Sequence, residues 1–160
     1  MRRILFGFLA FAFFALVWVS CDTKARCTPQ LRNAAKLVRT SADGERDTIS
    51  IQDSIRVGDT IRMSLFANGL YNYLTSLTVA SESEMSVSLE WSDEMSHCLA
   101  SDADPAKGRL IFVAEEVYAC TTVLHYTPLK SGKYRIEMLL SSDAGAPYSP
   151  AQYYFDVNVK

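Results

Sequence analysis

Residues 134–140 read YRIEMLL, and this stretch indicates the fold class of the whole chain. Every second residue in it is apolar, and an arginine and a glutamate stand between the first three. Successive side chains of a β-strand point to opposite faces, so a period of two predicts a strand with one buried and one solvated face. The same alternation appears in three further stretches, which are residues 61–65 (IRMSL), 86–92 (SVSLEWS) and 153–159 (YYFDVNV).

Glycines separate these expected strands. Asp43-Gly44 and Asn68-Gly69 are the strongest hairpin signals, because glycine accepts the positive φ of a tight turn. Turn residues recur about every 8–12 residues, as in sandwiches and barrels. We therefore predict an all-β fold, an antiparallel immunoglobulin-like β-sandwich of about seven to nine strands. A small β-barrel is the alternative.

Three stretches show a less regular pattern. Residues 110–114 (LIFVA) and 117–126 (VYACTTVLHY) are partly apolar on both sides. They are predicted to be central strands with both faces covered, or strands whose outer face meets a partner. Residues 30–39 (QLRNAAKLVR) fit either a helix or a strand, and the following Asp43-Gly44 turn favours a strand.

The amino terminus has the pattern of a bacterial lipoprotein signal peptide. Two arginines precede an apolar run at residues 4–19, which is shorter than the roughly 20 residues needed to cross a bilayer. The run ends at Ser20-Cys21, and we expect cleavage between these two residues and lipid on Cys21. An uncleaved signal anchor is the alternative. The chain then divides into a signal peptide (1–20), a lipidated cysteine with a short tether (21–27) and a single β-sandwich domain (28–160).

Net charge and cysteine content limit the classes of partner, disulfide and metal site that the chain can have. Cleavage leaves 14 basic and 18 acidic residues, a net charge of −4, which argues against a nucleic-acid partner. The remaining cysteines, Cys27, Cys98 and Cys120, allow one disulfide in any of three pairings and one free thiol. No two cysteines have the short spacing of a structural zinc site, so we predict no metal and no cofactor.

Catalytic motifs are scarce. His97 and His125 are the only histidines, and there is no Gly-x-Ser-x-Gly elbow. We expect no catalytic residues, and the alternative is a hydrolase or thiol enzyme that uses Cys98 and His125. His97 lies in a polar stretch and is expected to be solvated. As strand neighbours, His97 and Cys98 would point to opposite faces, so His97 is expected to be a poor base for Cys98.

Tyrosine is the most common aromatic residue after the signal peptide. Tyrosines suit interfaces because the ring is apolar and its tip is polar, although they also pair across strands. We predict a non-catalytic binding or assembly module of the envelope, with a glycan-binding module as the alternative. The partner, whether an envelope protein or a glycan, and the binding residues are left open. The tyrosines expected at turns and sheet edges are Tyr71, Tyr73, Tyr148, Tyr153 and Tyr154.

Short motifs add a family resemblance. They are Cys-Thr-Pro-x-Leu at 27–31, Asp-Thr-Ile at 47–49 and 59–61, Tyr-x-x-Leu-x-x-Leu at 71–77, and Ala119-Cys120 followed by Tyr126. In these motifs and in its lipidation signal, the chain resembles small envelope lipoproteins of Bacteroidetes.

The resemblance implies an all-β lipoprotein in which Cys27 and Cys120 pair, which leaves Cys98 as the free thiol. It also implies an outer-membrane location. Surface-exported members carry an acidic run after the lipidated cysteine, but here Asp22 is followed by Thr23 and Lys24. We therefore expect a protein that faces the periplasm, with the cell surface as the alternative.

The lipid anchor gives the first testable prediction. Cys21→Ala should move the protein from the membrane fraction to the soluble fraction, because several acyl chains on that residue provide the anchoring energy. Cell fractionation with immunoblotting measures this, and Cys27→Ala is the matched control that should stay bound. Persistent membrane binding of Cys21→Ala would contradict the lipoprotein assignment.

Overall fold

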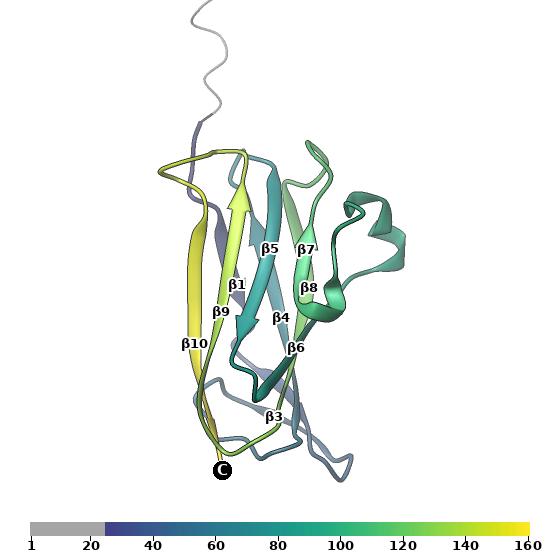
Figure 1. Cartoon of the computed structure of the whole chain (residues 1–160), viewed down its shortest axis with the longest axis vertical. Helices are drawn as coiled ribbons and strands as arrows, with labels where there is room; N and C mark the ends of the chain where they lie inside the picture. Colours follow the sequence, from purple (N-terminus) through teal and green to yellow (C-terminus); the bar gives the residue numbers. More distant parts are fainter. Residues whose placement is uncertain (1–24) are drawn as a thin grey trace, which may run out of the picture.

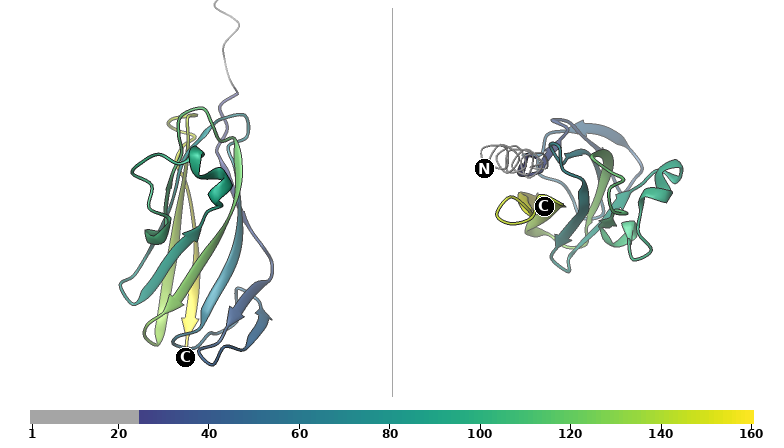
Figure 2. Two further views of the ribbon diagram at one scale, coloured as in Figure 1. Left: turned by 90° about the vertical axis from the view of Figure 1, so that its right-hand side faces the viewer. Right: turned by 90° about the horizontal axis from the view of Figure 1, so that it is seen from above.

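A computed structural model describes residues 25–160 of the chain. The predicted signal peptide, the cleavage site at Ser20 and the lipidated Cys21 lie outside the described residues. The described chain forms ten strands and two short 3₁₀ helices. Its strands are arranged in two facing antiparallel sheets, shown in Figures 1 and 2. The predicted all-β sandwich is confirmed, with ten strands in the described part in place of seven to nine.

The two sheets differ in size. The six-stranded sheet has the order β3 (Arg46–Ile49), β2 (Leu37–Thr40), β4 (Thr60–Asn68), β8 (Ala119–Pro128) and β6 (Met85–Glu90), and β1 (Gln30–Asn33) also pairs with β4. The four-stranded sheet has the order β10 (Ala151–Val159), β9 (Gly132–Ser142), β5 (Leu74–Ser81) and β7 (Arg109–Ile111). The two 3₁₀ helices are η1 (Asp93–Cys98) and η2 (Pro105–Lys107), and no helix among the described residues could cross a membrane.

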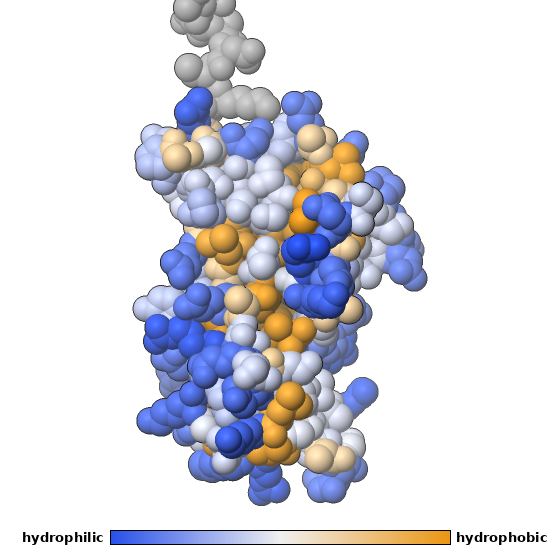
Figure 3. Space-filling view, in the orientation of Figure 1, coloured by the Kyte–Doolittle hydropathy of each residue, from blue (hydrophilic) through white to orange (hydrophobic). Residues whose placement is uncertain are grey.

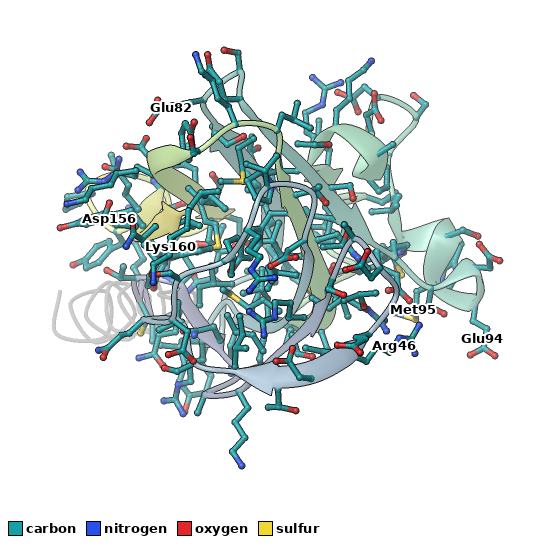
Figure 4. All side chains as sticks on the ribbon, turned by 90° about the horizontal axis from the view of Figure 1, so that it is seen from below. Arg46, Glu82, Glu94, Met95, Asp156 and Lys160 are labelled. Carbon is teal, nitrogen blue, oxygen red and sulfur yellow. The ribbon has the colours of Figure 1, made fainter. Side chains whose placement is uncertain are left out.

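The core lies between the two sheets and follows the alternation in the sequence. In β9, Ile136 and Leu140 are fully buried while Glu137 is exposed. Strand β4 buries Ile61 and Met63 completely from the opposite side. Viewed along the sandwich, charged residues such as Arg46, Glu94 and Asp156 lie at the periphery, whereas the space between the sheets is filled with side chains (Figure 4).

The less regular stretches gave mixed outcomes. Residues 30–39 contribute the strands β1 and β2, so the strand prediction is confirmed. Strand β8 lies between β4 and β6, so it is a central strand, but only its inward face is buried and its outer face is exposed or half-buried. The prediction of a central strand at residues 110–114 is wrong, because β7 has three residues and lies at a sheet edge. The chain leaves β7 at Phe112, which instead forms an isolated bridge with Leu99.

The two strongest hairpin signals also differ in outcome. Asp43-Gly44 forms the turn between β2 and β3, with Gly44 at a φ of 86°. Asn68-Gly69 does not form a hairpin, because β4 and β5 belong to different sheets. Gly69 is needed there for another reason, since a Cβ atom would lie 1.9 Å from the carbonyl oxygen of Asn72.

The alternation in β9 predicts unequal effects of neighbouring substitutions. Ile136→Ala should lower the free energy of unfolding by about 2–5 kcal/mol, because it leaves a cavity between the sheets. Glu137→Ala, the control on the solvated face, should change it by about 0.5 kcal/mol or less. Urea unfolding followed by circular dichroism measures both values, and equal destabilisation would contradict the observed facing of β9.

Candidate functional site

A groove lies on the outer face of the six-stranded sheet. Phe66 of β4 and Thr121 of β8 are direct partners in the antiparallel register, so both side chains point outward on the same face. The chain leaving β6 and the start of η1 supply the remaining wall. The groove has a volume of about 300 Å³ and is open to solvent. We call it the aromatic groove, and it is lined by Phe66, Trp91, Ser92, Met95, Ala119, Cys120 and Thr121.

Fixed contacts hold one wall of the groove. The indole Nε1 of Trp91 donates a hydrogen bond to the Met95 carbonyl oxygen at 2.9 Å. The same ring packs against Phe112, with 5.6 Å between ring centroids and a tilt of 52°. Phe66 and Met95 remain 43% and 41% exposed, so the groove presents apolar surface to solvent. Segment η1 projects from the side of the sandwich next to this face (Figure 2).

A charged cluster adjoins the groove on the same sheet face. Arg62 and His125 are direct partners in β4 and β8, and both point outward. Oε2 of Glu90 accepts hydrogen bonds from His125 Nε2 at 3.0 Å and from Arg62 Nη2 at 2.9 Å. The hydrogen bond from His125, followed by that from Arg62, lowers the pKa of Glu90 below its ordinary value. Glu90 is therefore ionised at neutral pH and is poorly suited to act as a general acid.

The cysteines depart from the predicted pairing. Cys27, Cys98 and Cys120 are all free thiols, so the predicted Cys27–Cys120 disulfide is absent. Cys27 precedes β1 and Cys120 lies in β8, and these two strands flank β4 on opposite sides. Burial raises the pKa of the Cys120 thiol to about 12, so it remains protonated at neutral pH.

The histidines have different partners from those considered for an enzyme. His97 is exposed, as expected, but Cys98 Sγ lies 3.4 Å from His97 Nε2, so the expectation of opposite faces is wrong. The two residues sit in the 3₁₀ turn η1 and not in a strand. Cys98 is 3% exposed, which keeps a substrate away from its sulfur. His125 binds Glu90, and Cys98 contacts His97. The structure therefore does not bring Cys98 and His125 together.

The five predicted tyrosines do lie in connections or in an edge strand. Tyr71, Tyr148 and Tyr154 are exposed, while Tyr73 stacks on Tyr118 with 3.9 Å between ring centroids. The Tyr153 hydroxyl donates to the Pro29 carbonyl oxygen at 2.8 Å. None of these tyrosines lines the aromatic groove.

His125 and Cys120 were singled out from the sequence, but the other residues that form the groove and the charged cluster were missed. The alternation of polar and apolar residues does place Arg62 and Glu90 on outward faces, which is the signal available in the sequence. Bringing them to His125 needs the registers of β4 and β6 with β8, which only the fold supplies. Within residues 25–160, no three histidine, cysteine or acidic side chains gather in a way that could hold a metal ion.

Comparison with known proteins gives weak likenesses. No protein-family model and no curated protein matches this sequence. The chain is similar to the solved N-terminal domain of PorA, at 11% identity and a TM-score of 0.41, over 78% of this chain and 97% of that domain. It is also similar to a family 123 glycoside hydrolase from Clostridium perfringens that was solved to study glycolipid glycan hydrolysis. That match has 12% identity and a TM-score of 0.34, over 66% of this chain and 21% of the hydrolase. Neither likeness carries an argument about function.

The different burial of the three cysteines predicts the order in which their thiols react with an alkylating reagent. At pH 8, iodoacetamide should alkylate the half-buried Cys27, whereas the buried Cys98 and Cys120 should be protected in the folded protein. All three should react in urea, because unfolding removes the burial. Peptide mass spectrometry measures the labelling. A Cys27–Cys120 peptide in non-reduced protein, or equal labelling of all three residues in the folded state, would contradict the structure.

Proposed function

We propose that this chain is a lipid-anchored, non-catalytic binding module of the bacterial envelope. In this proposal the aromatic groove receives an apolar side chain of a protein partner. The observation that carries the proposal is the open groove itself, in which Phe66 and Met95 are exposed beside the fixed ring of Trp91. Aromatic residues, methionine and arginine are the types enriched at protein interfaces.

The chemistry of the lining favours a protein partner over a glycan. A sugar carries several hydroxyl groups, and each one loses free energy if it is buried without a hydrogen-bond partner. In the groove, Ser92 and Thr121 are the lining side chains that offer hydroxyl groups, and the indole N–H of Trp91 is already used by Met95. An apolar side chain needs no such partners. The charged cluster of Arg62, Glu90 and His125 lies on the same face and could contact polar groups around it.

The candidate catalytic groups support a non-catalytic role. The Glu90 carboxylate accepts hydrogen bonds from His125 and Arg62, and these bonds lower its pKa. Cys120 lines the groove but lies on the buried face of β8, and burial raises the pKa of its thiol to about 12, so it is a poor nucleophile at neutral pH. The Cys98 thiol touches His97 but is buried.

The anchor in this proposal is the lipid on Cys21. It is supported by the apolar run, the Ser20-Cys21 boundary and the motifs shared with small envelope lipoproteins of Bacteroidetes. The proposed location is the outer membrane, with the domain facing the periplasm. Because the domain begins a few residues after the anchor, its partner would also be held at or near the membrane.

Site-specific photo-crosslinking tests the groove as the binding site. A benzophenone amino acid in place of Thr121 lies in the groove, and one in place of Asn158 lies on the outer face of the other sheet. In intact cells, the Thr121 position should give a discrete crosslinked protein that the Asn158 position does not give. Adding Phe66→Ser should lower this yield about tenfold, because removal of an interface anchor typically costs more than 1 kcal/mol.

The matched control for Phe66→Ser is Leu139→Ser. Leu139 is 41% exposed on the outer face of the other sheet, compared with 43% for Phe66. Leu139→Ser should leave the crosslinked yield unchanged. Equal crosslinking from both benzophenone positions, or equal loss in both serine variants, would overturn the groove as the binding site.

A further inference from the structure

Three connections meet at one end of the sandwich. They are residues 69–73 between β4 and β5, 112–118 between β7 and β8, and 143–150 between β9 and β10. Backbone hydrogen bonds join them, from Gly69 N to Tyr118 O at 2.8 Å and from Asp143 N to Tyr73 O at 2.9 Å. This end is therefore one connected surface, although it comes from three distant parts of the sequence (Figure 1).

Each connection exposes one tyrosine. Tyr71 is 76% exposed, Tyr118 is 47% exposed and Tyr148 is 39% exposed. We call the surface formed by these three residues the tyrosine end. Figure 3 shows many pale residues on the upper part of this face, with some blue residues along its edge and larger blue clusters further down. A tyrosine places an apolar ring next to a polar hydroxyl, which suits the boundary between an apolar and an aqueous phase.

The described chain also begins at the tyrosine end. The side chain of Asn72 is 2% exposed, and its Nδ2 donates to the carbonyl oxygen of Ala25 at 3.2 Å. The same Nδ2 contacts the carbonyl oxygens of Gly69 and Leu70 at 3.2 and 3.0 Å. Asn72 therefore ties the amino-terminal stretch to the connection that carries Tyr71.

The conformation of this connection is unusual for its residues. Leu70 and Tyr71 adopt φ angles of 48° and 74°, in the left-handed region that such side chains rarely occupy. The hydrogen bonds of Asn72 to Gly69 and Leu70 hold the connection in this form. The fold thus maintains a locally costly backbone at Tyr71, the most exposed large hydrophobic residue of the described chain.

We propose that the tyrosine end rests in the headgroup region of the bilayer that holds the lipid on Cys21. This inference rests on the lipid anchor of the proposed function. Four residues of extended chain span at most about 14 Å, so Ala25 and the tyrosine end stay close to the headgroups. Tyrosine is one of the residues enriched at this depth of a membrane. The anchor and the tyrosines then act together to orient the domain.

The charges at the tyrosine end select the kind of lipid surface. Glu115, Glu116 and Asp143 are exposed on the same connections, against one exposed cation, Arg26, in the adjoining amino-terminal stretch, so the acidic groups prevail. An anionic surface would repel these carboxylates, whereas zwitterionic headgroups would not. The contact therefore comes from the aromatic rings and not from attraction between opposite net charges.

Depth-dependent fluorescence quenching tests the inference. After cleavage before Cys21, Trp91 is the only tryptophan, so Trp91→Phe gives a background without this fluorophore. In that background, Tyr71→Trp and Tyr118→Trp report separately on the tyrosine end. Leu129→Trp is the control, because Leu129 is 60% exposed in the connection between β8 and β9, at the other end of β8 from Ala119. The full lipidated chain is reconstituted into phosphatidylcholine vesicles with and without brominated acyl chains.

Tyr71→Trp and Tyr118→Trp should emit at a shorter wavelength in vesicles than in solution. Their fluorescence should be weaker in brominated vesicles than in vesicles without bromine. Leu129→Trp should show neither change. If the protein sediments with the vesicles but the three variants are quenched equally, or none is quenched, the inference fails while the anchor stands. If the wild-type protein does not sediment with the vesicles, the anchor itself fails.

Discussion

The pairing of β4 with its neighbours is the interaction on which the rest of the structure depends. On one side, β4 pairs with β8 over eight residue pairs, from Ile61–Tyr126 to Asn68–Ala119. On the other side it pairs with both β1 and β2. Its inward side chains supply part of the core on the side of the six-stranded sheet, and its outward ones include Arg62 and Phe66. A slip of one residue in this register would exchange these two sets of side chains.

The groove is a consequence of that register and of the segment that follows β6. Strand β8 carries His125 next to Arg62 and Thr121 next to Phe66, so one sheet face presents a charged cluster beside an apolar site. The 3₁₀ turn η1 then closes one wall through the Trp91–Met95 hydrogen bond. A face of this kind offers an apolar contact beside polar groups, and the proposed binding role depends on this combination.

The sequence was sufficient for features that depend on local periodicity. Alternation in residues 134–140 and 61–65 predicted strands and their buried faces, and Asp43-Gly44 predicted a hairpin. Features that depend on which strands are neighbours could not be read in this way. Asn68-Gly69 carries a hairpin signal, but the chain uses it to cross between sheets. Cys27 and Cys120 were expected to pair, but both are free thiols in the structure. The groove was missed for the same reason, because Phe66, Trp91 and Thr121 meet only through non-local register.

The amino-terminal stretch has a mechanical consequence. It is attached to three separate parts of the domain: Asn72 binds Ala25, the Tyr153 hydroxyl of β10 binds Pro29, and β1 pairs with β4. Tension applied at the amino-terminal end would run along β1. It would load all the hydrogen bonds between β1 and β4 in shear at the same time, so they would not break one after another. Because β10 belongs to the other sheet, both halves of the sandwich would resist the pull together.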